Sequence, residues 1–256
     1  MIDIHSHIIP GIDDGSKDID TTIDMLKNAA NDGISSIVAT PHFCFDYGKA
    51  TITEVKQYVE KLNLLVQKEN INIKIFSGQE VYFYEGIIAD YKNGITGTIN
   101  DSRYMLIEFP MDKFPENAFD VLYELKIKNI VPIIAHVERY RYIVDDPSFI
   151  NKLIDEEYLF QLNAGSIEGK FGLSVQKTAE ILLKNGIYSF IGSDAHGVGR
   201  RCTGLKTALD ICKDIDENSV EMFLTNSEKL LNNKEVAFTG RKIEKKKKGL
   251  FSFLRK

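Results

Sequence analysis

Residues 1–16 read MIDIHSHIIPGIDDGS, and they place two histidines at the end of a short β-rich run. The run at 2–5 has the isoleucine-rich composition of a strand. His5 and His7 are two positions apart, so a strand directs both imidazoles to one face, where they can reach the same cation. Asp13 and Asp14 follow in a loop beside Gly15. This stretch predicts a strand whose carboxyl end carries a metal site, and a fold that gathers such strand ends.

Similar β-rich runs recur along the chain, separated by segments with helical periodicity. Strands are expected at residues 2–5, 37–40, 73–80, 105–109, 131–136, 159–163 and 189–194. Helices are expected at residues 18–31, 53–68, 115–128, 148–157, 174–185 and 203–213. Most of the strands follow one another at intervals of about thirty residues, the length of one βα unit. The pattern predicts parallel βα packing, either as a barrel or as a doubly wound sheet.

The composition is that of a globular protein. Of the 256 residues, 43% are hydrophobic and 27% are charged, which excludes extensive disorder. The mean hydropathy is -0.17, and no apolar stretch approaches the ~20 residues of a membrane span. The N-terminus lacks the basic and apolar regions of a signal peptide, and the three cysteines form no Cys-x-x-Cys pair. A cytoplasmic location is therefore expected.

The charge is unevenly distributed along the chain. Residues 241–256 carry eight basic side chains and one acidic side chain, which gives this segment a net charge of +7. Since the whole chain carries -5, the remainder carries -12, which argues against a nucleic-acid-binding surface. We expect a folded domain at residues 1–235 and a basic, flexible C-terminal tail at residues 236–256.

All five histidines fall at the carboxyl ends of expected strands. They are His5, His7, His42, His136 and His196. Active sites lie at this end of the strands in barrels and in open α/β sheets. Carboxylates at similar positions are Asp13, Asp14, Glu80, Glu108 and Asp194. Mixed histidine and carboxylate ligands suit Mn, Fe or Zn, and their number favours two or three ions with a bridging carboxylate.

Six motifs in this order resemble the PHP (polymerase and histidinol phosphatase) superfamily. They are HSH at 5–7, DDG at 13–15, PH at 41–42, the strand end at Glu80, AHVERY at 135–140 and SDAH at 193–196. More narrowly, MIDIHSHIIPGIDDGS, NDSRYMLIEFP and IAHVERY resemble the bacterial capsule-type, CpsB/YwqE-like, manganese-dependent tyrosine-protein phosphatases. The resemblance covers about residues 1–235. It implies an α/β fold, a PHP-type distorted (β/α)7 TIM-like barrel with the metal site at the carboxyl ends of the strands.

The resemblance also implies a trinuclear metal centre. The implied ligands are His5, His7, Glu80 and Asp194 for one ion, His136 with a bridging Glu80 for a second, and Asp14, His42 and His196 for the third. Asp13 is the alternative to Asp14, and Glu108 is interpreted as a structural carboxylate at the rim. Phosphate-binding arginines are implied at Arg139 and Arg201, with Arg200 as the other register.

The implied activity is hydrolysis of phosphotyrosine on proteins, with Mn2+ as cofactor. The implied substrate is a membrane-associated bacterial tyrosine kinase that controls capsule or exopolysaccharide synthesis. Two other hypotheses stay open: a PHP phosphoesterase that acts on a small monoester such as histidinol phosphate or on a nucleic-acid end, and a binding module without turnover. A cysteine-dependent tyrosine phosphatase is excluded, because no cysteine is followed by an arginine six positions later.

The chain ends in IEKKKKGLFSFLRK at residues 243–256, a polybasic run followed by an apolar cluster. A charge run at a chain end is usually a solvated, disordered segment. Lysines near an anionic leaflet, together with Phe and Leu side chains at the headgroup boundary, can instead hold a protein weakly at a membrane. The sequence therefore leaves open both a solvating tail and a peripheral contact with the inner face of the membrane.

Overall fold

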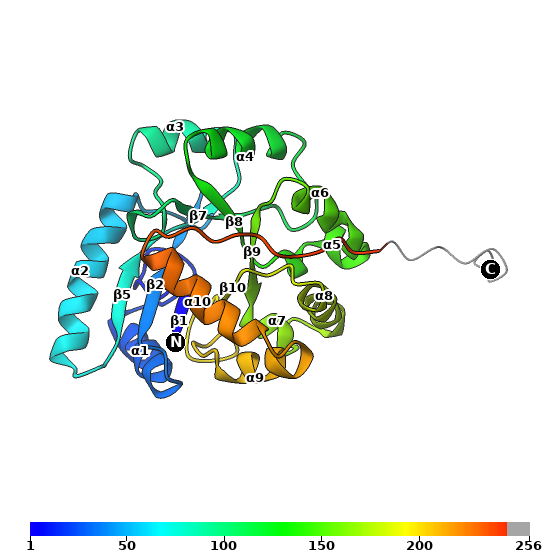
Figure 1. Cartoon of the computed structure of the whole chain (residues 1–256). Coiled ribbons are helices and arrows are strands. Elements are labelled where there is room, and N and C mark those ends of the chain that lie inside the picture. Colours follow the sequence, from blue (N-terminus) through cyan, green and yellow to red (C-terminus); the bar gives the residue numbers. More distant parts are fainter. Residues whose placement is uncertain (245–256) are drawn as a thin grey trace.

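Short strands and helices alternate along the structure, a computed structural model that describes residues 1–244 (Figure 1). The strands in this part of the chain are β1 (Ile2–Ser6), β2 (Ser36–Ala39), β3 (His42–Cys44), β4 (Gly48–Lys49), β5 (Lys74–Ser77), β6 (Glu80–Tyr82), β7 (Tyr104–Glu108), β8 (Val131–Ile134), β9 (Leu159–Asn163) and β10 (Phe190–Gly192). The α-helices are α1 (Ile19–Asn31), α2 (Ile52–Lys68), α3 (Ile87–Lys92), α4 (Ala118–Ile127), α5 (Arg141–Asp145), α6 (Asn151–Ile154), α7 (Ala164–Ile167), α8 (Leu173–Lys184), α9 (Lys206–Ile215) and α10 (Ser219–Leu231). The 3-10 turns are η1 (Ile99–Asp101), η2 (Val137–Arg139) and η3 (Pro147–Ile150).

The strands form a TIM-like α/β barrel. One sheet has the order β1-β2-β5 and the other the order β10-β9-β8-β7-β6-β3-β4. Every pairing is parallel except that of β3 with β4. The two sheets meet at β1 and β10, where the Asp194 N–H donates to the His5 carbonyl at 2.8 Å and the His7 N–H donates to the Ala195 carbonyl at 2.9 Å. Helices surround the strands on the outside (Figure 1).

Two strand runs bend where they enter the carboxyl end of the barrel. Residues 40–41 separate β2 from β3, and residues 78–79 separate β5 from β6, yet the pairing of β2 with β5 continues as the pairing of β3 with β6. Gly78 fits the second bend because a Cβ there would lie only 3.1 Å from a side chain on the neighbouring strand. The bends leave His42 directly paired with Glu80.

The observed elements agree with most of the expected ones. The expected strands at 2–5, 105–109 and 159–163 are confirmed as β1, β7 and β9. The expected strand at 73–80 is wrong at its end, because Gly78 interrupts it and Glu80 begins β6 instead of ending a single strand.

The helices differ from expectation in several places. The expected helix at 148–157 is instead η3 followed by the short helix α6, because the segment opens with a proline-led 3-10 turn. Helices α3, α5, α7 and α10 were not expected, and the β3–β4 hairpin was also missed. No helix among residues 1–244 is long and apolar enough to span a membrane.

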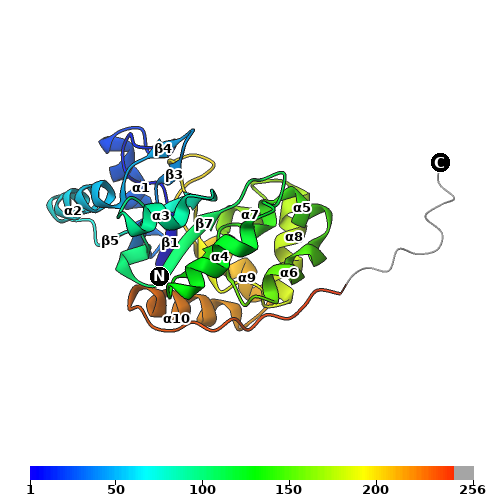
Figure 2. The same cartoon turned by 90° about the horizontal axis from the view of Figure 1, so that it is seen from above.

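Apolar side chains fill one half of the barrel and polar side chains fill the other. In β7, Tyr104, Leu106 and Glu108 share one face because alternate residues of a strand point the same way. Tyr104 and Leu106 belong to a buried apolar cluster that also includes Leu230 of α10. Figure 2 shows α10 at the end of the barrel opposite to β3 and β4. The polar half, at the carboxyl ends of the strands, is therefore the half that can hold a site.

The chain after α10 runs along the same end of the barrel as α10, opposite to the candidate site (Figures 1 and 2). The Tyr104 hydroxyl accepts a hydrogen bond from the Val236 N–H at 2.9 Å. Further along, the Ile243 N–H donates to an asparagine side chain of α6 at 2.8 Å. Residues 236–244 of the expected tail thus pack against the body, and residues 245–256 lie outside the described part of the chain.

Candidate metal centre

The structure brings all five histidines together at the carboxyl end of the barrel. His5 lies in β1 and His7 directly after it, His42 begins β3, and His136 and His196 follow β8 and β10. None of the five side chains is more than 10% exposed. Buried imidazoles need partners for their ring nitrogens, and here most of the neighbouring polar groups are carboxylates or other histidines.

The most buried group consists of His5, His7, Glu80 and Asp194, whose ligand atoms all lie within 4.8 Å of one another. The Nε2 atoms of His5 and His7 are 3.2 Å apart. Glu80 Oε2 lies 3.2 Å from the first of these nitrogens and 3.3 Å from the second. Asp194 Oδ1 lies 3.6 Å from His5 Nε2 and 3.5 Å from His7 Nε2. These four residues are the set that the resemblance implied for the first ion.

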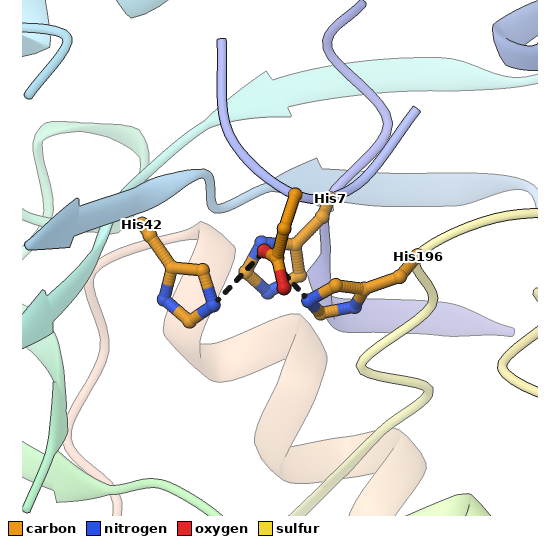
Figure 3. Close-up of side chains that lie close together, drawn as sticks. His7, His42 and His196 are labelled. Carbon is orange, nitrogen blue, oxygen red and sulfur yellow. Dashed lines mark ion pairs between the residues drawn. The ribbon is translucent and has the colours of Figure 1, made fainter. Parts of the chain in front are cut away.

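A second group shares His7 and lies closer to solvent. Figure 3 shows the rings of His7, His42 and His196 pointing toward one another. Asp14 Oδ1 lies 3.3 Å from His196 Nε2 and 3.5 Å from His42 Nε2, and the Asp14 side chain is 43% exposed. The ring centroid of His7 lies 4.4 Å from that of His42 and 3.9 Å from that of His196. The geometry therefore adds His7 to the three residues implied for the third ion.

Glu80 also belongs to a third group of candidate ligands, together with His42 and Glu108. Its Oε1 lies 2.8 Å from His136 Nε2, and its Oε2 lies 3.1 Å from His42 Nδ1. Glu108 lies 3.6 Å from His136 Nε2 and 3.8 Å from His42 Nδ1, so it faces the cluster, whereas the sequence suggested a carboxylate at the rim. The signal that could have found it is strand parity, since Glu108 follows the buried Leu106 by two positions.

The protein keeps two of these histidines in the form that binds metal. Burial lowers the pKa of His42 to about 4. Burial also lowers the pKa of His136 to about 4, and the positive charge of Arg139 contributes to this shift. At neutral pH both imidazoles are therefore uncharged, as a metal ligand must be.

The carboxylates at the centre repel each other. Burial raises the pKa of Glu108 well above its ordinary value, and the negative charges of Glu80 and Asp194 add to the shift. For Glu80, burial acts in the same direction, but the charge of His5 and the hydrogen bond from His136 outweigh it and hold the pKa of Glu80 well below its ordinary value. A bound cation would relieve this repulsion.

Several ligand atoms at the cluster are buried without a hydrogen-bond partner among the described residues. They include His42 Nδ1, Glu80 Oε2 and His196 Nε2. Leaving a buried polar atom unpaired costs about 1–3 kcal/mol. Because these atoms belong to the side chains that converge on one another, the donor set fits divalent cations bound among them.

Two arginines stand beside the cluster. Arg139 Nη1 donates to Asp194 Oδ2 at 2.8 Å, and Arg201 Nη2 donates to Asp194 Oδ1 at 2.8 Å. Both line a cavity of about 540 Å³ that most of the candidate ligands also line. Arg200 instead donates to the carbonyl of Lys170. Of the two registers that the sequence left open, the geometry favours Arg201.

Polar residues outside the cluster orient its histidines. Asp13 Oδ2 lies 2.8 Å from His7 Nδ1 and accepts a hydrogen bond from the His42 backbone N–H at 3.0 Å. Gln161 Oε1 lies 3.0 Å from His5 Nδ1. A partner at Nδ1 fixes the tautomer and leaves the Nε2 lone pair free to face a metal. The geometry therefore favours Asp14, not Asp13, as the ligand.

The barrel and the histidine–carboxylate cluster define a metal-binding α/β-barrel protein. The sequence profile of the family described as capsular polysaccharide synthesis, CpsB/CapC, matches residues 1–232. The chain therefore belongs to the CpsB/CapC family.

Similar proteins support this assignment. The tyrosine-protein phosphatase YwqE of Bacillus subtilis is 33% identical over 99% of this chain and 100% of its own length. The putative tyrosine-protein phosphatase CapC of Staphylococcus aureus is 33% identical over 96% of this chain and 94% of its own. A crystal structure from a study of YwqE and of CpsB from Streptococcus pneumoniae, described as metal-dependent tyrosine phosphatases, superposes with a TM-score of 0.91 at 33% identity. It covers 96% of this chain and 100% of that chain.

Removing the Asp13 carboxylate should weaken metal binding. In Asp13→Ala, His7 loses the partner at Nδ1, and the affinity for Mn2+ is expected to fall about 10–100-fold. Titration calorimetry on metal-free protein measures this affinity. The control is Asp24→Ala, which removes an exposed carboxylate from α1 and should keep the wild-type affinity. Equal affinities in the two variants would contradict the orienting role of Asp13.

Proposed function

We propose that this protein is a metal-dependent protein-tyrosine phosphatase, an enzyme that hydrolyses phosphotyrosine on proteins. The observation that carries the proposal is the presence of Arg139 and Arg201 in the same cavity as the candidate metal ligands. Hydrolysis of a phosphate monoester uses both metal ions and arginines, because the charge of the phosphoryl group is spread over several oxygens. The named relatives, YwqE and CapC, are described as a tyrosine-protein phosphatase and a putative one, respectively.

We propose that the barrel is of the PHP type, a distorted (β/α)7 barrel. The bent pairs β2–β3 and β5–β6 each count as one strand run. Together with β1, β7, β8, β9 and β10 they give seven parallel runs within residues 1–244, and β4 is an antiparallel addition. Helices lie between most of these runs along the chain, which supports the repeated βα pattern.

The proposed cofactor is Mn2+, with two or three ions per chain and Fe or Zn as alternatives. The proposed ligands are His5, His7, Asp14, His42, Glu80, His136, Asp194 and His196, and Glu108 joins them on the basis of its position. Imidazole and carboxylate donors together suit these metals. When bound, the metals supply Lewis acidity that activates water and offsets the charge of the phosphoryl group.

The arginines of this chain would bind and orient the phosphoryl group. The Cζ atom of Arg139 lies 4.5 Å from the centre of the Phe171 ring. The guanidinium groups of Arg139 and Arg201 both donate to Asp194, so their directions are fixed before substrate binds. The planar fork of N–H donors in a guanidinium group fits phosphate oxygens, and its positive charge complements their negative charge. Positive charge that is already in place stabilises the charge of a phosphoryl-transfer transition state.

The leaving group of phosphotyrosine suits this site. A tyrosine hydroxyl has an ordinary pKa of about 10, so tyrosinate leaves more readily than an alkyl alkoxide does. Hydrolysis of an aryl phosphate therefore depends less on a general acid. The cluster and the two arginines supply the remaining requirement, which is stabilisation of the phosphoryl charge.

The proposed substrate is a tyrosine-phosphorylated protein, in particular a membrane-associated bacterial tyrosine kinase that controls capsule or exopolysaccharide synthesis. The description of the family as capsular polysaccharide synthesis supports this choice. The alternative is a small monoester of the histidinol phosphate type or a nucleic-acid end, because the metal chemistry would be shared. The net charge of -12 outside residues 241–256 disfavours the nucleic acid.

Turnover of three substrates by the Mn2+-loaded protein tests the proposal. A phosphotyrosine peptide is expected to give a higher kcat/KM than histidinol phosphate or single-stranded DNA. His136→Ala is expected to lower kcat/KM for the peptide about 100-fold, the order of cost for one contact that stabilises transition-state charge. The proposal fails if histidinol phosphate or DNA is the best substrate, or if His136→Ala matches the wild type.

We also propose that the basic tail holds an otherwise cytoplasmic enzyme weakly at the inner face of the membrane. The support comes from sequence: residues 241–256 carry a net charge of +7, and four consecutive lysines precede an apolar cluster. Each lysine near an anionic leaflet contributes about 1 kcal/mol. A weak contact of this kind would raise the local concentration of the enzyme near a membrane-associated substrate.

Deletion of residues 245–256 tests the tail and spares residues 236–244, which pack against the body. The full chain should co-sediment with phosphatidylserine-containing vesicles in a salt-sensitive manner, and the truncated chain should not. Activity on a soluble phosphopeptide should be the same for both. Vesicles of neutral lipid are the control. Equal co-sedimentation of the two chains with the anionic vesicles would rule out the membrane role.

A further inference from the structure

An exposed aromatic ring stands at the mouth of the cavity. Tyr47 is 60% exposed, and among the large exposed hydrophobic side chains of residues 1–244 it is the one that lines this cavity. Its ring centroid lies 5.8 Å from that of His42, a member of the cluster. An exposed ring beside a buried charged centre offers apolar surface to whatever binds there.

The β3–β4 hairpin holds Tyr47 in this position. A Cβ at Gly48 would lie 2.6 Å from the Ile12 carbonyl, so glycine lets the hairpin pack closely against the loop that carries Asp14. The Phe45 ring packs edge-on against Tyr84, with their centroids 5.8 Å apart. Phe45 thus packs against Tyr84 and does not line the cavity, whereas Tyr47 does.

Metal-ligand candidates and arginines line one part of the cavity, and aromatic and apolar side chains contribute to other parts. The candidate ligands and the two arginines supply charged groups on one side, and Tyr82, Pro110 and Met111 line other parts of the same cavity, together with Asp46, Asp112 and Lys113. An aryl phosphate has the same division, because its ring is attached directly to the phosphate oxygen. A phosphoserine residue instead has a single methylene between the phosphate oxygen and the peptide backbone, and it offers no ring to Tyr47.

We propose that Tyr47 forms an aryl-binding subsite, where its ring packs against the phenyl ring of a phosphotyrosine side chain. The proposal rests on the phosphatase function proposed above and names the element that selects its substrate. Selection for aryl over alkyl phosphates then has a binding component at the β3–β4 hairpin, in addition to the leaving-group effect described above.

Steady-state kinetics with phenyl phosphate, and with inorganic phosphate as a competitive inhibitor, separate ring binding from phosphate binding. In Tyr47→Ala, the KM for phenyl phosphate is expected to rise about two- to tenfold, the range of one aromatic pair, while the Ki of inorganic phosphate stays within about twofold. Tyr47→Phe keeps the ring and should keep the low KM. Turnover of a phosphoserine peptide should change less than that of phenyl phosphate.

The matched control is Tyr123→Ala, which removes a tyrosine that is 59% exposed on α4, outside the cavity lining. An unchanged KM for phenyl phosphate in Tyr47→Ala, or an equal rise in the Ki of inorganic phosphate, would overturn the proposal. So would a loss of Mn2+ affinity in calorimetry, because Tyr47 would then support His42. If the wild type hydrolyses neither phenyl phosphate nor a phosphotyrosine peptide, the proposed function itself fails, which is a distinct outcome.

Discussion

The burial of one carboxylate, Glu80, among four histidines is the constraint on which the rest of the structure depends. Glu80 is fully buried, and ring nitrogens of His5, His7, His42 and His136 lie 2.8–3.3 Å from its oxygens. A buried charge without partners costs several kcal/mol, so this arrangement requires positive charge at its centre. The bend before β6 and the parallel pairing of β6 with β3 are the features that deliver Glu80 to this point.

Backbone strain at the site accompanies this concentration of charge. His136 and Asp194 have φ angles of 33° and 51°, in the left-handed region that residues other than glycine rarely adopt. Such positions cost about 1–3 kcal/mol each and persist only where the surroundings hold them. Asp194 is held by hydrogen bonds from Asn163, Arg139 and Arg201. The apolar cluster in the half of the barrel that α10 covers contributes folding stability that offsets this strain.

The alternation of strands and helices could be predicted from the sequence, because a half-buried strand and an amphipathic helix each leave a periodic pattern. The convergence of the histidines could be predicted for the same reason, since parallel strands end at one edge. The bend at Gly78 could not, because a glycine within a β-rich run leaves its periodicity unchanged. The approach of Glu108 to His42 depends on packing between segments far apart in the chain, which local patterns do not encode.

Anomalous diffraction at the manganese edge, from crystals of the Mn2+-loaded protein, tests the central claim most directly. The account predicts manganese peaks inside the cluster, one among His5, His7, Glu80 and Asp194 and another among His7, Asp14, His42 and His196. A third peak is expected beside Glu80, Glu108 and His136 if the site holds three ions. Manganese peaks only elsewhere on the protein, or none at all in crystals whose solution sample had taken up the metal, would contradict the account.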